Sequence, residues 1–280
     1  MIMKTNFEQA KGQSKSDFKR DTGISLENFI KVLQLIEDHI KKLHEENPNK
    51  KKGVKSSFTI ADKLLLTLYY LRHYATFKNL GDIFGISESY ANKIFHSILD
   101  ILVQELHVSG SNELLNSDLD TIVIDATEQE TERPVKKQKK YYSGKKKKHT
   151  IKIQLVISLF TMQIICVRVE KGSVHYFRVL KESLYKIHPD ILILADSGYQ
   201  GINKIHGNSW IPHKESKKNP LTKEQKKENK ALAQLRIYVE MVNRRCKIFR
   251  IAKDIFRGKH RNYGKIWNAI AGLVNLRYAL

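Results

Sequence analysis

Cysteine, acidic residues and long apolar runs are all scarce in this sequence. The two cysteines, Cys166 and Cys246, lie in apolar or helical surroundings without a CxxC or Cys/His spacing, which argues against a disulfide framework and a zinc site. No window approaches the roughly 18 uncharged apolar residues of a membrane span, and residues 1–20 contain no hydrophobic signal region. We therefore expect a cytoplasmic protein with no membrane partner.

Lys and Arg far outnumber Asp and Glu, so the chain is strongly basic. Fifty Lys and Arg residues face 29 Asp and Glu residues, for a formal net charge of +21 and a pI near 9.8. This charge favours a polyanionic partner, and nucleic acid ranks before a membrane surface because no polybasic run flanks an apolar span. With 280 residues, 41% of them hydrophobic, the chain can form one or two domains with a substantial core.

Residues 1–115 are predicted to form an all-α domain. Apolar residues recur at helical spacing over 26–45 and over 59–74, where Thr59 can cap the helix. In "TFKNLGDIFGISESYANKIFHSILDILVQEL" a short helix meets Gly85, and Ser87 can cap a second helix. A turn of about three to four residues with a glycine is typical of a helix-turn-helix motif.

A helix-turn-helix motif here would turn one set of side chains of its second helix toward DNA. The alternative, which the pattern supports equally, is an ordinary helical hairpin in a bundle, and only the basic composition favours DNA. The outward residues expected to contact DNA, next to Glu88, are Ser89, Asn92, Lys93 and His96.

From residue 116 to 280 the pattern changes to strands followed by helices. Three strands are predicted in "LDTIVID", "TIKIQLVIS" and "MQIICVRVE", then a helix over 173–187 and a buried strand over 191–195. "NSWIPHK" can hold one more short strand, and the chain from about 222 is helical in pattern. This order indicates an α/β fold with a mixed sheet covered by helices, an RNase H-like core preceded by the helix-turn-helix domain.

Two aspartates follow apolar runs at predicted strand ends. Asp125 and Asp196 would converge if their strands are neighbours, although an aspartate in such a place also serves as a turn or cap former. Glu240 lies at the border of the apolar stripe of a helix predicted over 231–253. Three carboxylates at one rim would repel each other unless divalent metal held them ionised.

Such an arrangement suits metal-assisted phosphoryl transfer. Two Mg²⁺ ions about 3.5–4 Å apart, which Mn²⁺ can replace, would activate the attacking oxygen and stabilise the leaving one. No GxSxG, GxxxxGK[ST] or GxGxxG pattern is present, which argues against hydrolase-elbow and NTPase chemistry.

Four blocks of the sequence resemble a known family. "VIDATEQETERP", "KKYYSGKKKKHTIKIQLVIS", "LADSGYQGI" and "ALAQLRIYVEMVNRRCKIFRI" are similar, in order, to blocks of bacterial insertion-sequence transposases of the DDE class, the insertion-sequence-five group and its relatives. The resemblance covers roughly residues 55–280. It implies an RNase H-like fold, Mg²⁺ dependence, cutting and joining of DNA, and Asp125, Asp196 and Glu240 as the catalytic, metal-binding triad.

A further motif of related transposases spaces Tyr, Arg, Glu and Lys along one helix. Arg236, Glu240 and Lys247 stand at the right intervals, whereas Ala233 replaces the Tyr. The resemblance implies that Arg236 holds Glu240 or a DNA phosphate and that Lys247 contacts a phosphate. Only 43 residues separate Asp196 from Glu240, which leaves no room for a large inserted domain.

Basic runs supply the other predicted DNA contacts. Residues 136–148 contain eight lysines with Tyr141 and Tyr142 among them, which offers stacking surface beside phosphate contacts. The alternative is a solvated hairpin tip. The residues predicted to contact DNA in these runs are Lys145, Lys146, Lys147, Lys148, His149, Arg244 and Arg245.

Three hypotheses about function follow. The leading one is an insertion-sequence transposase, located at the nucleoid, that binds double-stranded DNA at terminal inverted repeats and at its target, and acts as a homodimer or larger assembly on DNA. The second is a DNA-binding protein without catalysis, either a decayed transposase or a repressor. The third is an RNase H-like nuclease without strand transfer.

Overall fold

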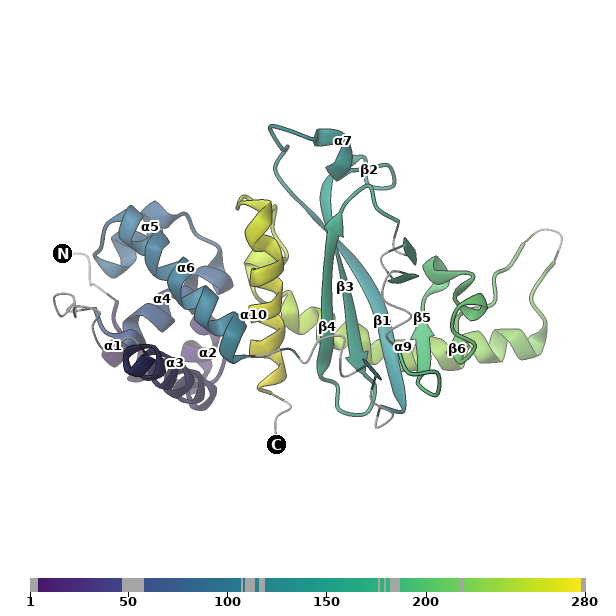
Figure 1. Cartoon of the computed structure of the whole chain (residues 1–280), viewed down its shortest axis with the longest axis horizontal. Coiled ribbons are helices and arrows are strands. Elements are labelled where there is room, and N and C mark those ends of the chain that lie inside the picture. The colour runs from purple at the N-terminus through teal and green to yellow at the C-terminus, as the bar shows by residue number, and fades with distance from the viewer. Residues whose placement is uncertain are drawn as a thin grey trace. The chain divides into compact units, whose positions relative to one another are not determined.

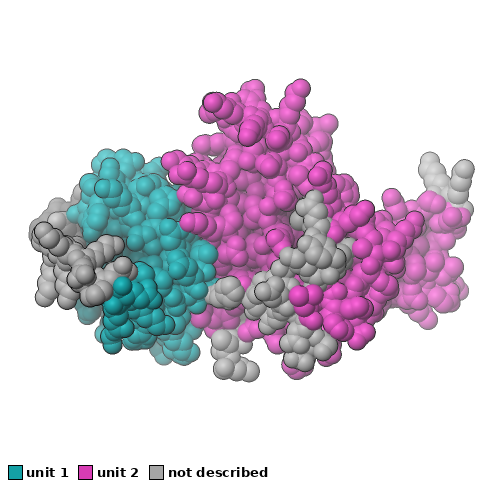
Figure 2. Space-filling model, in the orientation of Figure 1, with its two compact units in different colours: residues 1–107, 247–254 teal, residues 108–246, 255–280 magenta. Residues whose placement is uncertain are grey.

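The computed structural model describes residues 5–46, 58–106, 108, 114–115, 119–175, 177–178, 180–181, 187–216 and 219–277. The chain forms two compact units, coloured separately in Figure 2. The first contains residues 1–107 and 247–254, and the second contains residues 108–246 and 255–280. The chain thus returns to its first unit near the C-terminus, which the sequence pattern did not indicate. The functional division at residue 115 stays a prediction.

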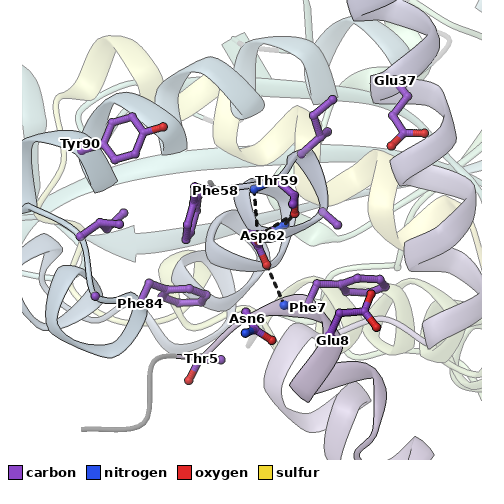
Figure 3. Close-up of a pocket in the computed structure, with 14 residues that line it drawn as sticks. Thr5, Asn6, Phe7, Glu8, Glu37, Phe58, Thr59, Asp62, Phe84 and Tyr90 are labelled. Atoms are coloured by element: carbon purple, nitrogen blue, oxygen red, sulfur yellow. Dashed lines mark hydrogen bonds between the residues drawn. The ribbon is translucent and has the colours of Figure 1, made fainter. Parts of the chain in front are cut away.

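The first unit is helical, as predicted. Its helices are α1 (Phe7–Lys11), α2 (Lys15–Thr22), α3 (Leu26–Glu46), α4 (Ile60–His73), α5 (Phe77–Phe84) and α6 (Glu88–Glu105) (Figure 1). Thr59 caps α4, because its Oγ1 accepts from the backbone N–H of Asp62, whose carboxylate accepts from Thr59 in return. Asp62 also accepts from the N–H of Phe7, as Figure 3 shows. This acid therefore holds the N-terminal segment on α4.

A hollow of about 690 Å³ opens beside Asp62 in the first unit. Its lining includes Phe58, Phe84 and Tyr90, which Figure 3 labels. The carboxylate of Asp62 is already bonded to Thr59 and Phe7.

The turn between α5 and α6 has the predicted form. Gly85 ends α5 in the left-handed region with φ 67°, and the Oγ of Ser87 accepts from the N–H of Tyr90 at the start of α6. A Cβ on Gly81 would lie 2.6 Å from the carbonyl oxygen of Ile86, so α5 and the turn that follows it lie too close together there for a side chain. The helix-turn-helix geometry follows from these three residues.

Residues 247–254 complete the first unit. Phe249 is 1% exposed and fills the space that the missing side chain of Gly23 leaves, since a Cβ there would lie 2.5 Å from its ring. Arg72 donates to the backbone oxygens of Arg20 and Ile248. The helix predicted over 231–253 ends too late: α9 runs Lys223–Cys246, and only a 3-10 turn, η4 (Arg250–Ala252), follows. Its start agrees with the helical pattern predicted from about residue 222.

The second unit is built on a mixed sheet. Its strands are β1 (Thr121–Glu130), β2 (Tyr142–Ser143), β3 (Lys148–Ser158), β4 (Ile164–Lys171), β5 (Leu192–Ala195) and β6 (Ser209–Trp210). β3 pairs antiparallel with β1, β2 and β4, whereas β5 pairs parallel with β1 and with β6. This arrangement confirms the predicted fold class and the short strand in "NSWIPHK". The helix predicted over 173–187 lies partly outside the described residues.

The two faces of the sheet have different neighbours. On one face Ile122, Ile124 and Ala195 belong to a core cluster with Leu180 and Tyr199. Residues of β1 alternate between faces, so Val123, Asp125 and Gln129 lie on the other face. Two helices cover that face: α9 reaches Asp125 through Asn243, and α10 (Tyr263–Asn275) reaches Gln129 through the hydroxyl of Tyr263.

In the described part of the chain, none of the helices combines the length and the apolar character that crossing a bilayer requires.

Candidate active site

Asp125 and Asp196 lie at neighbouring positions on two parallel strands. β1 and β5 pair in parallel with Ile124 opposite Ala195, and the residue that follows each of these two is an aspartate. Asp196 follows β5 directly, as predicted. The prediction that Asp125 ends its strand is wrong, because β1 continues to Glu130. The polar residues after Asp125 remain extended because each pairs with β3, as far as Glu130 opposite Thr150.

Helix α9 holds the carboxylate of Asp125 from two sides. The Nδ2 of Asn243 donates to its Oδ2 at 2.6 Å, and the guanidinium of Arg236 lies 3.9 Å from its Oδ1. The side chains of Asp125 and Arg236 are only 16% and 23% exposed, so their opposite charges are largely screened from water by the protein. Together these contacts fix the side of α9 that faces β1.

Sequence reasoning missed Asn243. Its signal was a polar residue within an otherwise apolar helical stripe, which periodicity alone cannot assign to a partner. The buried apolar members of that stripe are Leu232, Val239, Val242 and Cys246.

Asp196 serves partly as a cap. Its Oδ1 accepts from the backbone N–H of Gly198 at 2.8 Å and so starts the 3-10 turn η2 (Ser197–Tyr199). The turn-forming role that the sequence left open is therefore real for one of the two carboxylate oxygens. Because the side chain is only half-buried, its second oxygen can serve a ligand.

Glu240 lies on α9 between the two residues that hold Asp125. It comes four residues after Arg236 and three before Asn243, and these spacings place all three on one side of a helix. Glu240 is exposed. Within the described residues, no three His, Cys, Asp or Glu side chains form a cluster that could hold a metal ion. The sheet thus brings Asp125 and Asp196 to neighbouring positions, and Glu240 is not joined to them.

The donor atoms at this place nevertheless fit a hard divalent cation. Carboxylate and amide oxygens are the protein ligands that such cations prefer. Asp125 and Asp196 supply carboxylates, and the Oδ1 of Asn243 is a buried oxygen that lacks a hydrogen-bond partner among the described residues. Arg236 provides positive charge beside Asp125.

The lysine-rich run forms a hairpin whose short α7 (Gln138–Tyr141) and β2 lie at one end of β3 (Figure 1). Lys145, Lys146 and Lys147 are exposed in its turn, whereas Lys148 forms an ion pair of 2.7 Å with Glu130. His149 is half-buried against Tyr142, which is itself 42% exposed. The hairpin therefore presents cations beside one aromatic ring, and its contact with DNA stays a prediction.

The predicted DNA-facing residues of α6 do lie on its outer side. Ser89 and Lys93 are exposed, and Asn92 and His96 are half-buried. Beneath them Ala91, Ile94, Phe95 and Ile98 are buried. The outer side of α6 is therefore accessible, as reading DNA requires.

The remaining predicted DNA contacts differ in accessibility. Arg244 is exposed at the end of α9, whereas Arg245 is half-buried, and burial together with the charge of Arg277 lowers the pKa of its guanidinium. Lys247 is half-buried at the point where the chain enters the first unit. Arg244 is thus the readiest of the three for a phosphate.

Comparison with known proteins matches both parts of the chain. Residues 124–275 match the family described as DDE superfamily endonuclease, and residues 56–107 match the helix-turn-helix of DDE superfamily endonuclease. The chain is also 41% identical over 277 residues to "Probable transposase for insertion sequence element IS702" of Microchaete diplosiphon, which covers 98% of each protein. The first range contains Asp125, Asp196 and Glu240, and the second contains α4, α5 and α6.

Proposed function

The chain belongs to the DDE superfamily endonucleases, and on this basis we propose that it is the transposase of an insertion sequence, acting at the nucleoid. As a member it is a nuclease-type enzyme with a helix-turn-helix domain. The named relative, described as a probable transposase over nearly the whole length of both chains, supports the more specific function.

The observation that supports the proposal is the register of the parallel strands β1 and β5. Ile124 lies opposite Ala195, so Asp125 and Asp196 occupy neighbouring positions in sequence after this pair, and α9 carries Glu240 between Arg236 and Asn243, which both approach Asp125. We assign Asp125, Asp196 and Glu240 as catalytic residues and metal ligands. This role requires Glu240 to lie close to the two aspartates when substrate and metal are bound.

Proteins of this superfamily generally use divalent metal ions. We propose two Mg²⁺ ions, with Mn²⁺ as a substitute, held by the triad. When bound, they supply Lewis-acid activation of the attacking oxygen and charge stabilisation at the leaving oxygen. The chain itself orients these carboxylates: Asn243 and Arg236 fix Asp125, and Gly198 fixes Asp196.

The reaction has two phosphoryl transfers. Water attacks a phosphodiester at the element end, the bond to the 3′ oxygen breaks, and a 3′-hydroxyl and a 5′-phosphate remain. That 3′-hydroxyl then attacks a phosphodiester of target DNA and displaces its 3′ oxygen. Both steps pass through a charged transition state that cations stabilise.

DNA binding is assigned to three places. The outer side of α6 would read the terminal inverted repeats, and the lysine hairpin and the end of α9 would contact phosphates. Because two element ends are joined, we propose a homodimer or larger assembly on double-stranded DNA. The proposed contacts are Ser89, Asn92, Lys93, His96, Lys145, Lys146, Lys147, Lys148, His149, Arg236, Arg244, Arg245 and Lys247.

The test uses DNA that carries the ends of the element encoding this chain. Asp125→Asn, Asp196→Asn and Glu240→Gln should each reduce Mg²⁺-dependent cleavage to background while DNA binding is retained, because each removes a metal ligand and little volume. Asp190→Asn is the matched control, since Asp190 is 85% exposed and lies just before β5. Full cleavage by any of the three triad variants would contradict its assignment.

Two other outcomes would select the alternatives. Cleavage without joined products would indicate a nuclease without strand transfer. Binding without cleavage by the unmodified chain, in Mg²⁺ and in Mn²⁺, would indicate a DNA-binding protein without catalysis.

A further inference from the structure

Asn243 is a polar residue inside the apolar face of α9. It is 7% exposed, and Val239, Val242 and Cys246 around it are fully buried. Burial of an amide is costly unless its donors and its acceptor find partners. Asn243 therefore requires an explanation that packing of α9 on the sheet does not supply.

Only one half of the Asn243 amide is used. Its Nδ2 donates to Asp125 at 2.6 Å, whereas its Oδ1 is buried and accepts no hydrogen bond from any described residue. The unused atom is an acceptor, so the group that completes the site must be a donor or a cation. An acceptor of this kind beside a carboxylate points to a hydrated cation, which offers both the positive charge and the O–H donors of its bound water.

A second asparagine of the same unit shows what a purely structural amide looks like. Asn275 joins α10 to β4, and both halves of its side-chain amide are hydrogen-bonded. Its Oδ1 accepts from the N–H of Ile164 at 2.8 Å, and its Nδ2 donates to the carbonyl oxygen of Ile164 at 2.9 Å. Asn275 is complete within the protein. Asn243 is not, and this difference separates the two roles.

We propose that Asn243 is a positioning residue for the cation site at Asp125. Its Nδ2 fixes the orientation of the Asp125 carboxylate, and its Oδ1 accepts a hydrogen bond from a water molecule in the hydration shell of the cation that Asp125 binds. The guanidinium of Arg236, two helical turns earlier on α9, lies 3.9 Å from the other oxygen of the same carboxylate. This inference rests on the proposed function, because it needs a divalent cation at Asp125.

The test measures cation binding by the full-length protein without DNA. Mn²⁺ is titrated calorimetrically into the unmodified chain, Asn243→Ala, Asn275→Ala and Asp125→Asn. We expect Asn243→Ala to weaken Mn²⁺ binding by roughly 10- to 100-fold, the range for partners of metal ligands. Asn275→Ala should lower the melting temperature and leave Mn²⁺ affinity unchanged.

The outcomes separate this inference from the function on which it rests. Unchanged Mn²⁺ affinity in Asn243→Ala, with Asp125→Asn defective, would overturn the role of Asn243 alone. Equal Mn²⁺ binding by the unmodified chain and Asp125→Asn would instead overturn the metal site, and with it the proposed role of Asp125.

A second variant covers the case in which Asn243→Ala does not fold. Asn243→Asp keeps the shape, removes the Nδ2 donor and places a carboxylate next to Asp125. The two charges repel each other without metal, so the variant should melt at a lower temperature than the unmodified chain. Mn²⁺ should then raise its melting temperature by more than it raises that of the unmodified chain. An equal or smaller rise would overturn the placement of position 243 at the cation.

Discussion

The outer side of α6 and the lysine hairpin are both proposed to contact DNA, but their chemistry differs. On α6 the exposed residues include one lysine, Lys93, and two acids, Glu88 and Asp100; the others carry hydroxyl or amide groups and are Ser89, Ser97 and Gln104. Residues 136–148 contain eight lysines and no acid. Amide and hydroxyl side chains can bind base edges as well as phosphates, whereas a run of exposed lysines mainly contacts phosphates and so contributes affinity for any sequence. We therefore propose that selectivity for sequence resides mainly on α6 and affinity for DNA mainly on the hairpin.

The largest effect is expected from Phe249→Ala, which should impair the DNA-reading surface of α6 and leave the lysine hairpin intact. The ring is buried against Gly23 in the unit that carries α6, and deleting such a ring typically costs about 3–5 kcal/mol. We expect the first unit to lose its protection from hydrogen exchange. Binding to inverted-repeat DNA should fall to the level of unrelated DNA, because the hairpin belongs to the other unit.

The matched control for this variant is Phe160→Ala. Phe160 is 94% exposed in the turn after β3, so its removal should change stability by less than about 0.5 kcal/mol. If Phe249→Ala kept full preference for inverted-repeat DNA, residues 247–254 would not be needed for the reading surface.

Replacing Lys145, Lys146 and Lys147 by Gln should give the next largest effect. These lysines are exposed, and Lys148 is left in place because it pairs with Glu130. We expect affinity for all DNA sequences to fall alike. The slope of log affinity against log salt should become shallower by up to about 2.7, since each lost phosphate contact removes about 0.9.

A control of equal charge change replaces Lys11, Lys41 and Lys42 by Gln on α1 and α3, where all three are exposed. A smaller change in slope than that of the hairpin variant is expected. Equal slopes in the two variants would show that only net charge matters, and the hairpin would then be a solvated tip.

Asn92→Ala should reduce the selectivity for the inverted-repeat sequence more than it reduces the overall affinity for DNA. An asparagine that reads a base edge contributes about 1–3 kcal/mol of discrimination, so preference for the inverted repeat should fall by that amount while the salt slope stays constant. Competition binding against unrelated DNA measures both quantities. Asn28→Ala, at a half-buried asparagine of α3, is the control and should leave the preference intact.

The sequence predicted well those features that depend on neighbouring residues. α3, α4 and the turn at Gly85 follow from periodicity and caps within a few residues of each other. Asp196 was placed correctly because a short apolar run ends beside it.

The features that the sequence did not predict depend on distant residues. β1 continues past Asp125 because β3 pairs with it, and Phe249 leaves the helix because it packs on Gly23 more than two hundred positions earlier. Asn243 meets Asp125 across 118 positions. Periodicity identifies the face on which a residue lies but not the residue that it meets.

The smallest expected effect is a difference in pH dependence between the two units. Burial lowers the pKa of His73 in the first unit and of His260 in the second below the ordinary 6.5. His260 lies 2.8 Å from the hydroxyl of Thr131 and packs on Tyr141 at the base of the lysine hairpin. Well above pH 6.5 both histidines are neutral in the folded and the unfolded chain, so neither contributes a pH-dependent term to stability. As the pH falls below 6.5 the unfolded chain takes up protons first, and stability decreases until the pH reaches the lower folded pKa.

His260→Gln should therefore reduce the stability that the unit carrying the hairpin loses in acid. His73→Gln should do the same for the unit that carries α6. Thermal melts between pH 7.5 and 5.5, with hydrogen exchange to separate the units, measure both, and His44→Gln on the exposed end of α3 is the control. If His260→Gln and the unmodified chain lost stability equally in the hairpin unit, burial of His260 would not be the cause of its acid sensitivity.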